Sequence, residues 1–134
     1  MAASKKILSV GLGSFASFDA NATANFGPDA GEKTKVLLQT SIEKANAAGF
    51  EVVTEDANPK DPEDTLKRFT KTLQSGDFVG VNIGYGLRGQ KEHTELFETI
   101  INIAWQVKPG IKIMFSNGPD QVITAIQRSF PEAF

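Results

Sequence analysis

Four short β-rich runs alternate with four longer helical patterns along the chain, and this alternation constrains the fold more than any other feature. Such alternation is typical of βαβ units, in which helices connect parallel strands and cover the sheet. No repeat, linker or low-complexity tract interrupts it, so residues 1–134 are expected to form one α/β domain. The expected strands are Lys6–Leu12, Phe50–Glu55, Phe78–Ile83 and Ile111–Ser116.

Capping signals mark the helices between these strands. The first helix is expected from about Ala30 to Ala47, with Asp29 as N-cap, Glu32 at the capping-box position and Gly49 as its stop. The second has Asp61 as its cap and Pro62 at the first helical position. It is expected to stop at Gly76, and the other two helices are expected over Gln90–Val107 and Pro119–Ser129.

The continuity of the apolar runs predicts the order of the strands. The first and third runs, ILSVGL and FVGVNI, are nearly uninterrupted, whereas FEVVTE and IKIMF carry charges. Strands buried on both faces lack polar alternation, so the first and third belong in the centre and the order is 2-1-3-4. Right-handed crossovers then place two helices on each face. The expected fold is a flavodoxin-like, three-layer α/β/α sandwich with a four-stranded parallel sheet.

The stretch SVGLGSFA after the first strand matches the dinucleotide fingerprint G-x-G-x-x-G/A, but not its context. That fingerprint must open directly into a helix, whereas a long loop up to Asp29 follows here. The stretch GPDAGEKT resembles a phosphate-binding P-loop but has Glu32 where the second glycine belongs. We therefore expect neither cofactor. Receiver-domain, flavin and GxSxG hydrolase patterns are also missing, and one histidine with no cysteine predicts no metal site.

Charge and hydropathy exclude two classes of partner. The net charge is −2 and no basic run is present, so nucleic acid is not an expected partner. No apolar run approaches the roughly 18 residues of a membrane span, and the N-terminal segment does not read as a signal peptide. We expect a cytoplasmic protein that does not associate with membranes.

Ligands of such sheets bind at the carboxyl ends of the strands where the strand order reverses, here between the first and third strands. The loops at that point are Gly13–Asp29 and Gly84–Gly89, the longest and the most glycine-rich loops of the chain. His93 follows the second loop, and we consider it the candidate catalytic residue. The candidate ligand-binding residues are Gly13, Ser14, Asn82, Gly84, Tyr85, Gly86, Arg88 and Asn117.

Three of these candidates have an alternative structural interpretation. His93 falls within the apolar arc of the third helix, so it is either a buried, hydrogen-bonded core histidine or a ligand-binding or acid-base group. Arg88 precedes a helix N-terminus and either binds an anion there or pairs with Glu92 in solvent. Asn117 either reaches the ligand or begins the last helix.

The strings ILSVGLGSF and GLRG…H…LFETIINIAWQVKPGIKIMFSNGPDQ resemble a group of small fungal and bacterial flavodoxin-like (Rossmann-like) α/β proteins. Members have a strand ending in a glycine turn, then GLR, a helix with LFE and IN, and a strand of the form P-x-x-x-I-x-F-[NS]. The similarity covers most of the chain. It implies the fold and the importance of the GLR segment, and it implies no catalytic residue.

Taken together, these features predict a domain that binds a small polar or anionic molecule at the carboxyl edge of the sheet. The sequence leaves open whether the protein is an enzyme. The alternative is a non-catalytic interaction or homo-oligomer module, in which Phe15, Phe18 and Phe26 of the long loop, together with Trp105, cover a partner.

Overall fold

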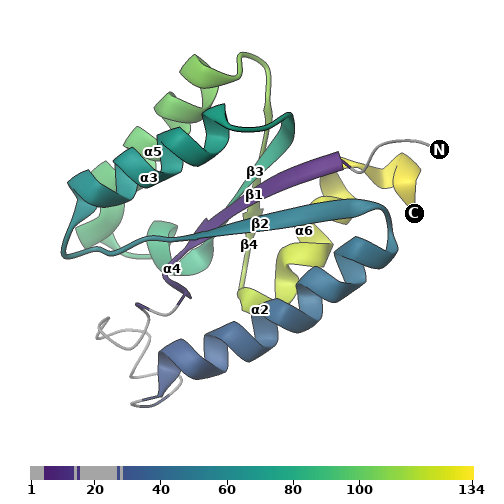
Figure 1. Ribbon diagram of the computed structural model, residues 1–134. Coiled ribbons are helices and arrows are strands. Elements are labelled where there is room, and N and C mark those ends of the chain that lie inside the picture. Colours follow the sequence, from purple (N-terminus) through teal and green to yellow (C-terminus); the bar gives the residue numbers. More distant parts are fainter. Residues whose placement is uncertain (1–4, 14, 16–26, 28) are drawn as a thin grey trace.

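The fold is built on a four-stranded parallel sheet (Figure 1). The computed structural model describes residues 5–13, 15, 27 and 29–134. The strands lie in the order β2-β1-β3-β4, which confirms the predicted order. Their bounds are β1 (Lys5–Gly11), β2 (Phe50–Asp56), β3 (Phe78–Gly84) and β4 (Lys112–Ser116).

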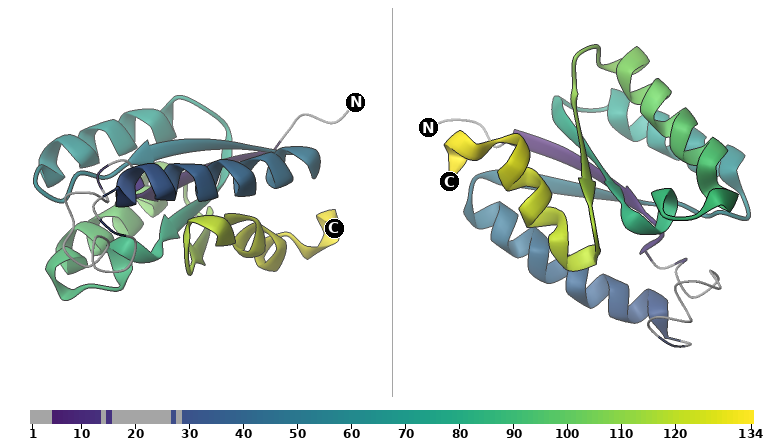
Figure 2. Two further views of the ribbon diagram at one scale, coloured as in Figure 1. Left: turned by 90° about the horizontal axis from the view of Figure 1, so that it is seen from below. Right: turned by 180° about the vertical axis from the view of Figure 1, so that it is seen from behind.

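Two long helices cover each face of the sheet, as predicted from right-handed crossovers (Figures 1 and 2). On one face lie α2 (Ala30–Ala47) and α6 (Val122–Ser129). On the other lie α3 (Pro62–Gln74) and α5 (Thr94–Val107). We call these the α2/α6 face and the α3/α5 face. None of the described helices is both long and apolar enough to cross a bilayer.

Each face has its own apolar core, because successive side chains of a strand point to opposite sides of the sheet. Leu8 and Val10 of β1 and Ile83 of β3 pack towards α3 and α5. Ile7 of β1 and Met114 of β4 pack towards α2 and α6. The two central strands are therefore buried on both sides, which explains their continuous apolar runs.

The capping residues behave differently at two of the helices. Asp61 caps α3 as predicted, and its carboxylate Oδ1 accepts the Asp64 backbone N–H at 3.2 Å. Asp29 precedes α2, but the predicted capping box is wrong, because its side chain makes no capping hydrogen bond. Instead its carboxylate lies 3.3 Å from the ammonium group of Lys33 one turn later. Gly49 follows the end of α2 in the left-handed conformation, with φ of 94°.

Two predicted helices begin later than expected. β3 continues directly into the short helix α4 (Tyr85–Arg88), and an extended Gln90 then interrupts the helical path. A 3-10 helix over Lys91–His93 follows, so α5 begins at Thr94. Similarly, Pro119 opens a 3-10 helix (Pro119–Gln121), and α6 begins only at Val122. A further 3-10 helix, Pro131–Ala133, ends the described chain.

Candidate functional site

A cavity of about 150 Å³ lies at the carboxyl edge of the sheet, on its α2/α6 face. All four strands contribute to its lining, and so do α2 and α6. It therefore lies where the strand order reverses between β1 and β3, the position predicted for a ligand in this class of sheet. A cavity of this size can hold a single six-membered ring.

Three polar side chains from three neighbouring strands form the floor of the cavity. Asn82 lies on β3 between Ser9 on β1 and Ser116 on β4. Its amide Nδ2 donates to the Ser9 Oγ at 3.0 Å and to the Ser116 Oγ at 3.2 Å. All three side chains are buried, and Asn82 is only 1% exposed. We call these residues the polar floor.

The amide oxygen of Asn82 has no hydrogen-bond partner among the described residues, although it is fully buried. Leaving a buried carbonyl without a partner costs about 1–3 kcal/mol, and native structures contain few such groups. An apolar side chain can fill this kind of position in a central strand, as Ile7 does on the same face of β1. The polar floor therefore stands out as a feature that packing alone does not require.

Two glycines keep the space above the polar floor open. Gly11 and Gly84 follow Ser9 and Asn82 by two residues, so any side chains there would point to the same face of the sheet. Both glycines line the cavity. A Cβ atom at Gly84 would approach no atom closer than 3.5 Å, and one at Gly11 none closer than 3.9 Å. The backbone tolerates side chains here, and their absence creates the cavity.

The walls of the cavity are largely apolar. Leu38 of α2, Val122 of α6 and Pro119 contribute apolar surface, and the half-exposed Tyr85 also lines the cavity. Thr34 and Thr54 add hydroxyl groups. A mostly apolar cavity with a few convergent polar groups is the usual form of a small-molecule site.

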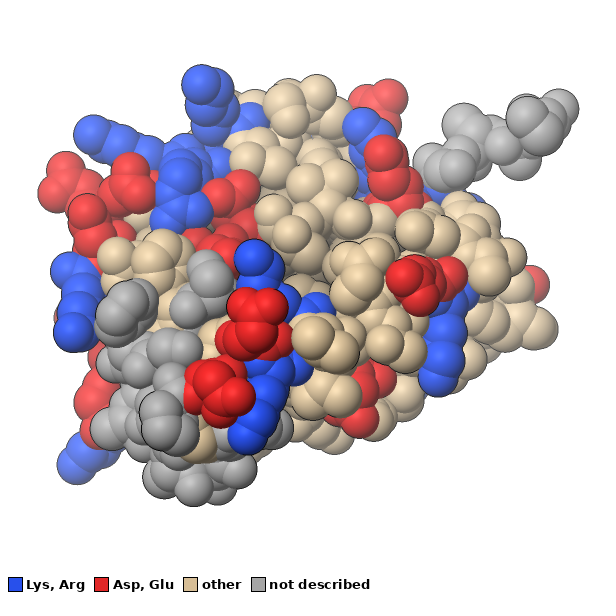
Figure 3. Space-filling model, turned by 60° about the horizontal axis from the view of Figure 1, so that its bottom comes forward, with Lys and Arg blue, Asp and Glu red and all other residues tan. Residues whose placement is uncertain are grey.

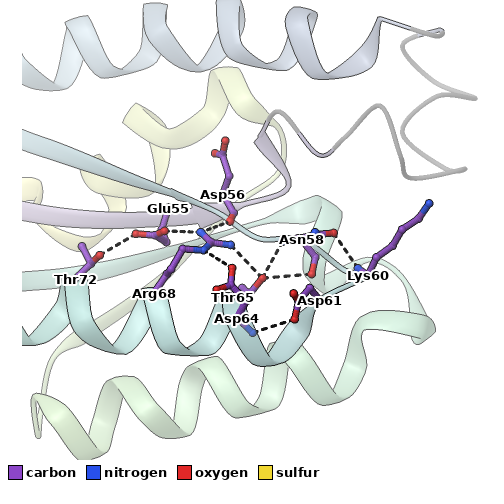
Figure 4. A network of polar contacts seen from close by, with 9 residues as sticks. All are labelled: Glu55, Asp56, Asn58, Lys60, Asp61, Asp64, Thr65, Arg68 and Thr72. Carbon is purple, nitrogen blue, oxygen red and sulfur yellow. Dashed lines mark hydrogen bonds and ion pairs between the residues drawn. The ribbon is translucent and has the colours of Figure 1, made fainter.

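Two acidic residues at the end of β2, Glu55 and Asp56, line the cavity, but the Glu55 carboxylate is held by Arg68 and Thr72 of α3. The Arg68 guanidinium donates to Glu55 Oε1 at 2.6 Å and to the Asp56 carbonyl at 2.9 Å, while the Thr72 hydroxyl donates to the second oxygen of Glu55. Figure 4 shows the Asp56 carboxylate on the opposite side of β2 from Arg68. The Asp56 carboxylate packs against Gly13, which has a φ of 52°. A side chain at Gly13 would collide with this carboxylate.

Arg68 also bonds to its own helix, which fixes its charge. Its Nε donates to Asp64 Oδ2 at 2.8 Å. The hydrogen bond to Asp64 raises the pKa of Arg68; burial opposes this shift, and the hydrogen bond to Glu55 adds to it. Arg68 therefore remains a cation that ties the end of β2 to α3.

The structure brings five of the nine sequence-predicted site residues together. Gly13, Asn82, Gly84, Tyr85 and Gly86 all line the cavity. Arg88, His93 and Asn117 do not. Ser14, Phe18 and Phe26 lie outside the described residues.

Arg88 is held by β4 and its following loop instead of facing the cavity. Its Nη2 donates to the Asn117 Oδ1 at 2.7 Å, and its guanidinium carbon lies 5.0 Å from the centre of the Tyr85 ring and 5.3 Å from that of Phe115. The predicted pairing with Glu92 is wrong, because the ion pairs among the described residues do not include these two side chains. Asn117 makes no capping hydrogen bond for the helix that follows, and its oxygen serves Arg88.

His93 is buried, as its place in the apolar arc predicts, with 8% of its surface exposed. It ends the 3-10 helix before α5, and its backbone N–H donates to the Gln90 carbonyl at 3.1 Å. The structure thus places His93 at the end of the 3-10 helix that follows the GLR segment, outside the cavity lining. Its assignment as a catalytic residue remains a prediction from the sequence.

Sequence reasoning missed both serines of the polar floor and the contribution of α2. Ser9 and Ser116 each follow a buried apolar residue, Ile7 or Met114, on the same face of their strand, and that change from apolar to polar is the signal that could have found them. Thr34 and Leu38 carried no such signal, because their position depends on how α2 crosses the sheet. Asp56 is the residue that follows the predicted end of the second strand.

Lys and Arg side chains alternate with Asp and Glu over the face seen in Figure 3, so no basic patch forms there. Within the described ranges, no group of three or more histidine and carboxylate side chains could hold a metal ion.

Comparison of the chain with protein-family models, with curated protein sequences and with solved structures found no match. The resemblance to the fungal and bacterial flavodoxin-like group therefore remains a prediction.

Proposed function

We propose that this protein binds a small polar molecule in the cavity above the polar floor. The observation that carries the proposal is the Asn82 amide oxygen, which is buried at the base of the cavity and has no partner among the described residues. A ligand that donates a hydrogen bond to this oxygen would remove the cost of leaving it unsatisfied. A well-packed apolar core has no such requirement.

The position and shape of the cavity support the same proposal. It lies at the carboxyl edge of a parallel sheet, at the reversal of strand order where ligands of such sheets bind. Gly11 and Gly84 leave the space empty although both positions have room for a Cβ atom. Because Arg88 and His93 do not line this space, the proposal is a binding function and assigns no reaction.

The test is a fragment screen monitored by backbone amide chemical shifts. We expect ring-sized fragments to shift the amides of Ser9, Asn82 and Ser116, with dissociation constants of roughly millimolar size, as is usual for ligands of so few atoms. The variant Gly84→Val places a branched side chain in the cavity and should abolish these shifts. The matched control, Asn117→Ala, changes a residue outside the lining and should preserve them. A library without one hit at the polar floor, or hits that survive Gly84→Val, would refute the proposal.

Exposed aromatic side chains support the second candidate function, a non-catalytic interaction or homo-oligomer module. Trp105 on α5 is 52% exposed, and Phe15 is partly buried. Large exposed aromatic side chains are enriched at protein interfaces. If Trp105 covers a second copy of the chain, sedimentation analysis should show a concentration-dependent dimer that Trp105→Glu dissociates. A monomer at all concentrations would remove this alternative for a self-associating module.

A further inference from the structure

The hydrogen-bonding groups of the polar floor define what a ligand must offer. Both protons of the Asn82 amide nitrogen are directed to serine oxygens, so this residue has only its carbonyl oxygen left, as an acceptor. Each serine hydroxyl accepts one bond from Asn82 and still has its own proton to donate. The polar floor therefore presents one acceptor, the Asn82 oxygen, and two donors, the serine hydroxyls beside the amide nitrogen of the same residue.

The charges around the cavity narrow the class of ligand further. None of the described residues that line it is a lysine or an arginine, and two, Glu55 and Asp56, are acidic. An anion would lose its hydration without gaining a cationic partner, so the anionic ligand considered from the sequence is disfavoured. For a cation the remaining acidic side chain is Asp56, because the Glu55 carboxylate already pairs with Arg68. The polar floor itself carries no charge and favours an uncharged ligand.

The size and the apolar walls of the cavity limit the ligand to a single ring. A volume of about 150 Å³ is enough for one six-membered ring but not for a dinucleotide or a nucleoside triphosphate. Leu38, Val122 and Pro119 offer apolar surface to the faces of such a ring. The polar part of the ligand must then lie at the ring edge that meets the polar floor.

We infer that the ligand is an uncharged, single-ring molecule with a lactam edge, that is, an N–H beside a C=O within the ring. The N–H donates to the Asn82 Oδ1, and the neighbouring carbonyl accepts the hydroxyl proton of Ser9 or Ser116. A lactam ring places a donor and an acceptor side by side, which matches the adjacent acceptor and donor of the polar floor. This inference rests on the proposed function and specifies the ligand class of the same cavity.

Four single-ring probes test the inference on the unmodified protein, and the first two are matched in size and shape. The first is 2-pyridone, which carries the lactam edge. The second is 2-pyranone, in which an oxygen replaces the N–H without changing the ring. Benzoate and benzylammonium supply the anionic and cationic cases. We expect 2-pyridone to shift the amides of Ser9, Asn82 and Ser116 and to bind about tenfold or more tightly than 2-pyranone, because the latter leaves the Asn82 oxygen unpaired.

Variants then tie this preference to the polar floor. Asn82→Ala removes the acceptor and should bring the ratio of the two dissociation constants, 2-pyridone to 2-pyranone, close to one. Asn117→Ala is the matched control and should leave that ratio unchanged, because Asn117 does not line the cavity. If Asn82→Ala does not fold, the probe series on the unmodified protein still decides the matter.

The outcomes separate this inference from the proposed function. If benzoate, benzylammonium or 2-pyranone binds at the polar floor as tightly as 2-pyridone, the lactam class is refuted while binding in the cavity stands. If only other fragments of the screen bind there, the lactam class is likewise refuted. If no molecule shifts the polar floor, both proposals fail, and ordered water is left as the partner of Asn82.

Discussion

The two faces of the sheet differ most at its carboxyl edge. On the α3/α5 face, Val10, Ile83 and Leu87 are fully buried and join a continuous apolar core. On the α2/α6 face, the same strands present Ser9, Asn82 and two glycines to a cavity. Adjacent residues such as Asn82 and Ile83 thus belong to different environments. The α3/α5 face is packed for stability, whereas the α2/α6 face loses part of that packing to a cavity.

Ile83→Ala tests the packed face and has the largest expected effect. Ile83 of β3 is fully buried in the apolar core beneath the helices of the α3/α5 face. Truncation should lower the free energy of unfolding by about 2–5 kcal/mol, since it removes apolar contacts and leaves a void. Urea denaturation measures the change, with the exposed Val36→Ala as control. A loss no larger than that of the control would show that this face is not the packed one.

Arg68→Ala tests the connection between α3 and the end of β2. The variant loses hydrogen bonds to Glu55, Asp64 and the Asp56 carbonyl. We expect a loss of about 1–2 kcal/mol in the free energy of unfolding, at the low end for charged hydrogen bonds because solvent screens the partly exposed side chain. Thermal or urea unfolding measures it. Lys67→Ala, at the exposed neighbouring position, should change stability by much less; an equal loss would contradict the role given to Arg68.

Arg88→Ala tests whether Arg88 contributes to ligand binding or only to stability. Its contacts with Tyr85, Phe115 and Asn117 predict a loss of about 1 kcal/mol in stability. Fragment binding at the polar floor should persist, because Arg88 does not line the cavity. Unfolding curves and amide shift titrations of the same variant give both values. The contrary result is binding weakened tenfold or more, while the amides of the polar floor keep their chemical shifts in the absence of ligand. Arg88 would then belong to the site, and an anionic ligand would be favoured.

Gly84→Ala has the smallest expected effect on stability, and the effect has the opposite sign. The backbone at Gly84 is extended, with φ of −70°, and a Cβ atom fits there without a clash. Replacing a glycine at such a position stabilises a protein by about 0.4–1 kcal/mol through the unfolded state. Differential scanning calorimetry measures the gain. Gly13→Ala is the contrasting variant: it should destabilise the protein, because Gly13 has a positive φ and lies against the Asp56 carboxylate. A destabilising Gly84→Ala would mean that the cavity is less open than described.

The strand order and the helix layers could be predicted because they follow from local patterns. The apolar continuity of ILSVGL and FVGVNI is a direct consequence of burial on both faces, and Asp61 with Pro62 marks a helix start by local geometry. Asp29 shows the limit of this reasoning. Aspartate is a common N-cap residue, but the Asp29 carboxylate pairs with the ammonium group of Lys33 and makes no capping hydrogen bond.

The candidate site could be predicted in position but only in part in composition. Asn82 was found because it lies near the carboxyl end of an apolar strand, at the correct edge of the sheet. Arg88 and His93 were placed at the ligand because a glycine-rich loop was expected, whereas that segment forms α4 and a 3-10 helix. Its path depends on contacts with Phe115 and Asn117, which are distant in the sequence. Such long-range contacts leave no signal in a single sequence.

The pair of glycines at the ends of β1 and β3 makes the cavity adjustable. Its volume depends on two missing side chains, and neither glycine needs a positive φ. Replacement by alanine, serine or valine would therefore reduce the space in small steps while the backbone stays in place. If the proposed function holds, proteins descended from this chain could accept smaller rings, or lose binding altogether, without any change of architecture. Within such a lineage, the residues at these two positions would report ligand size better than the fold does.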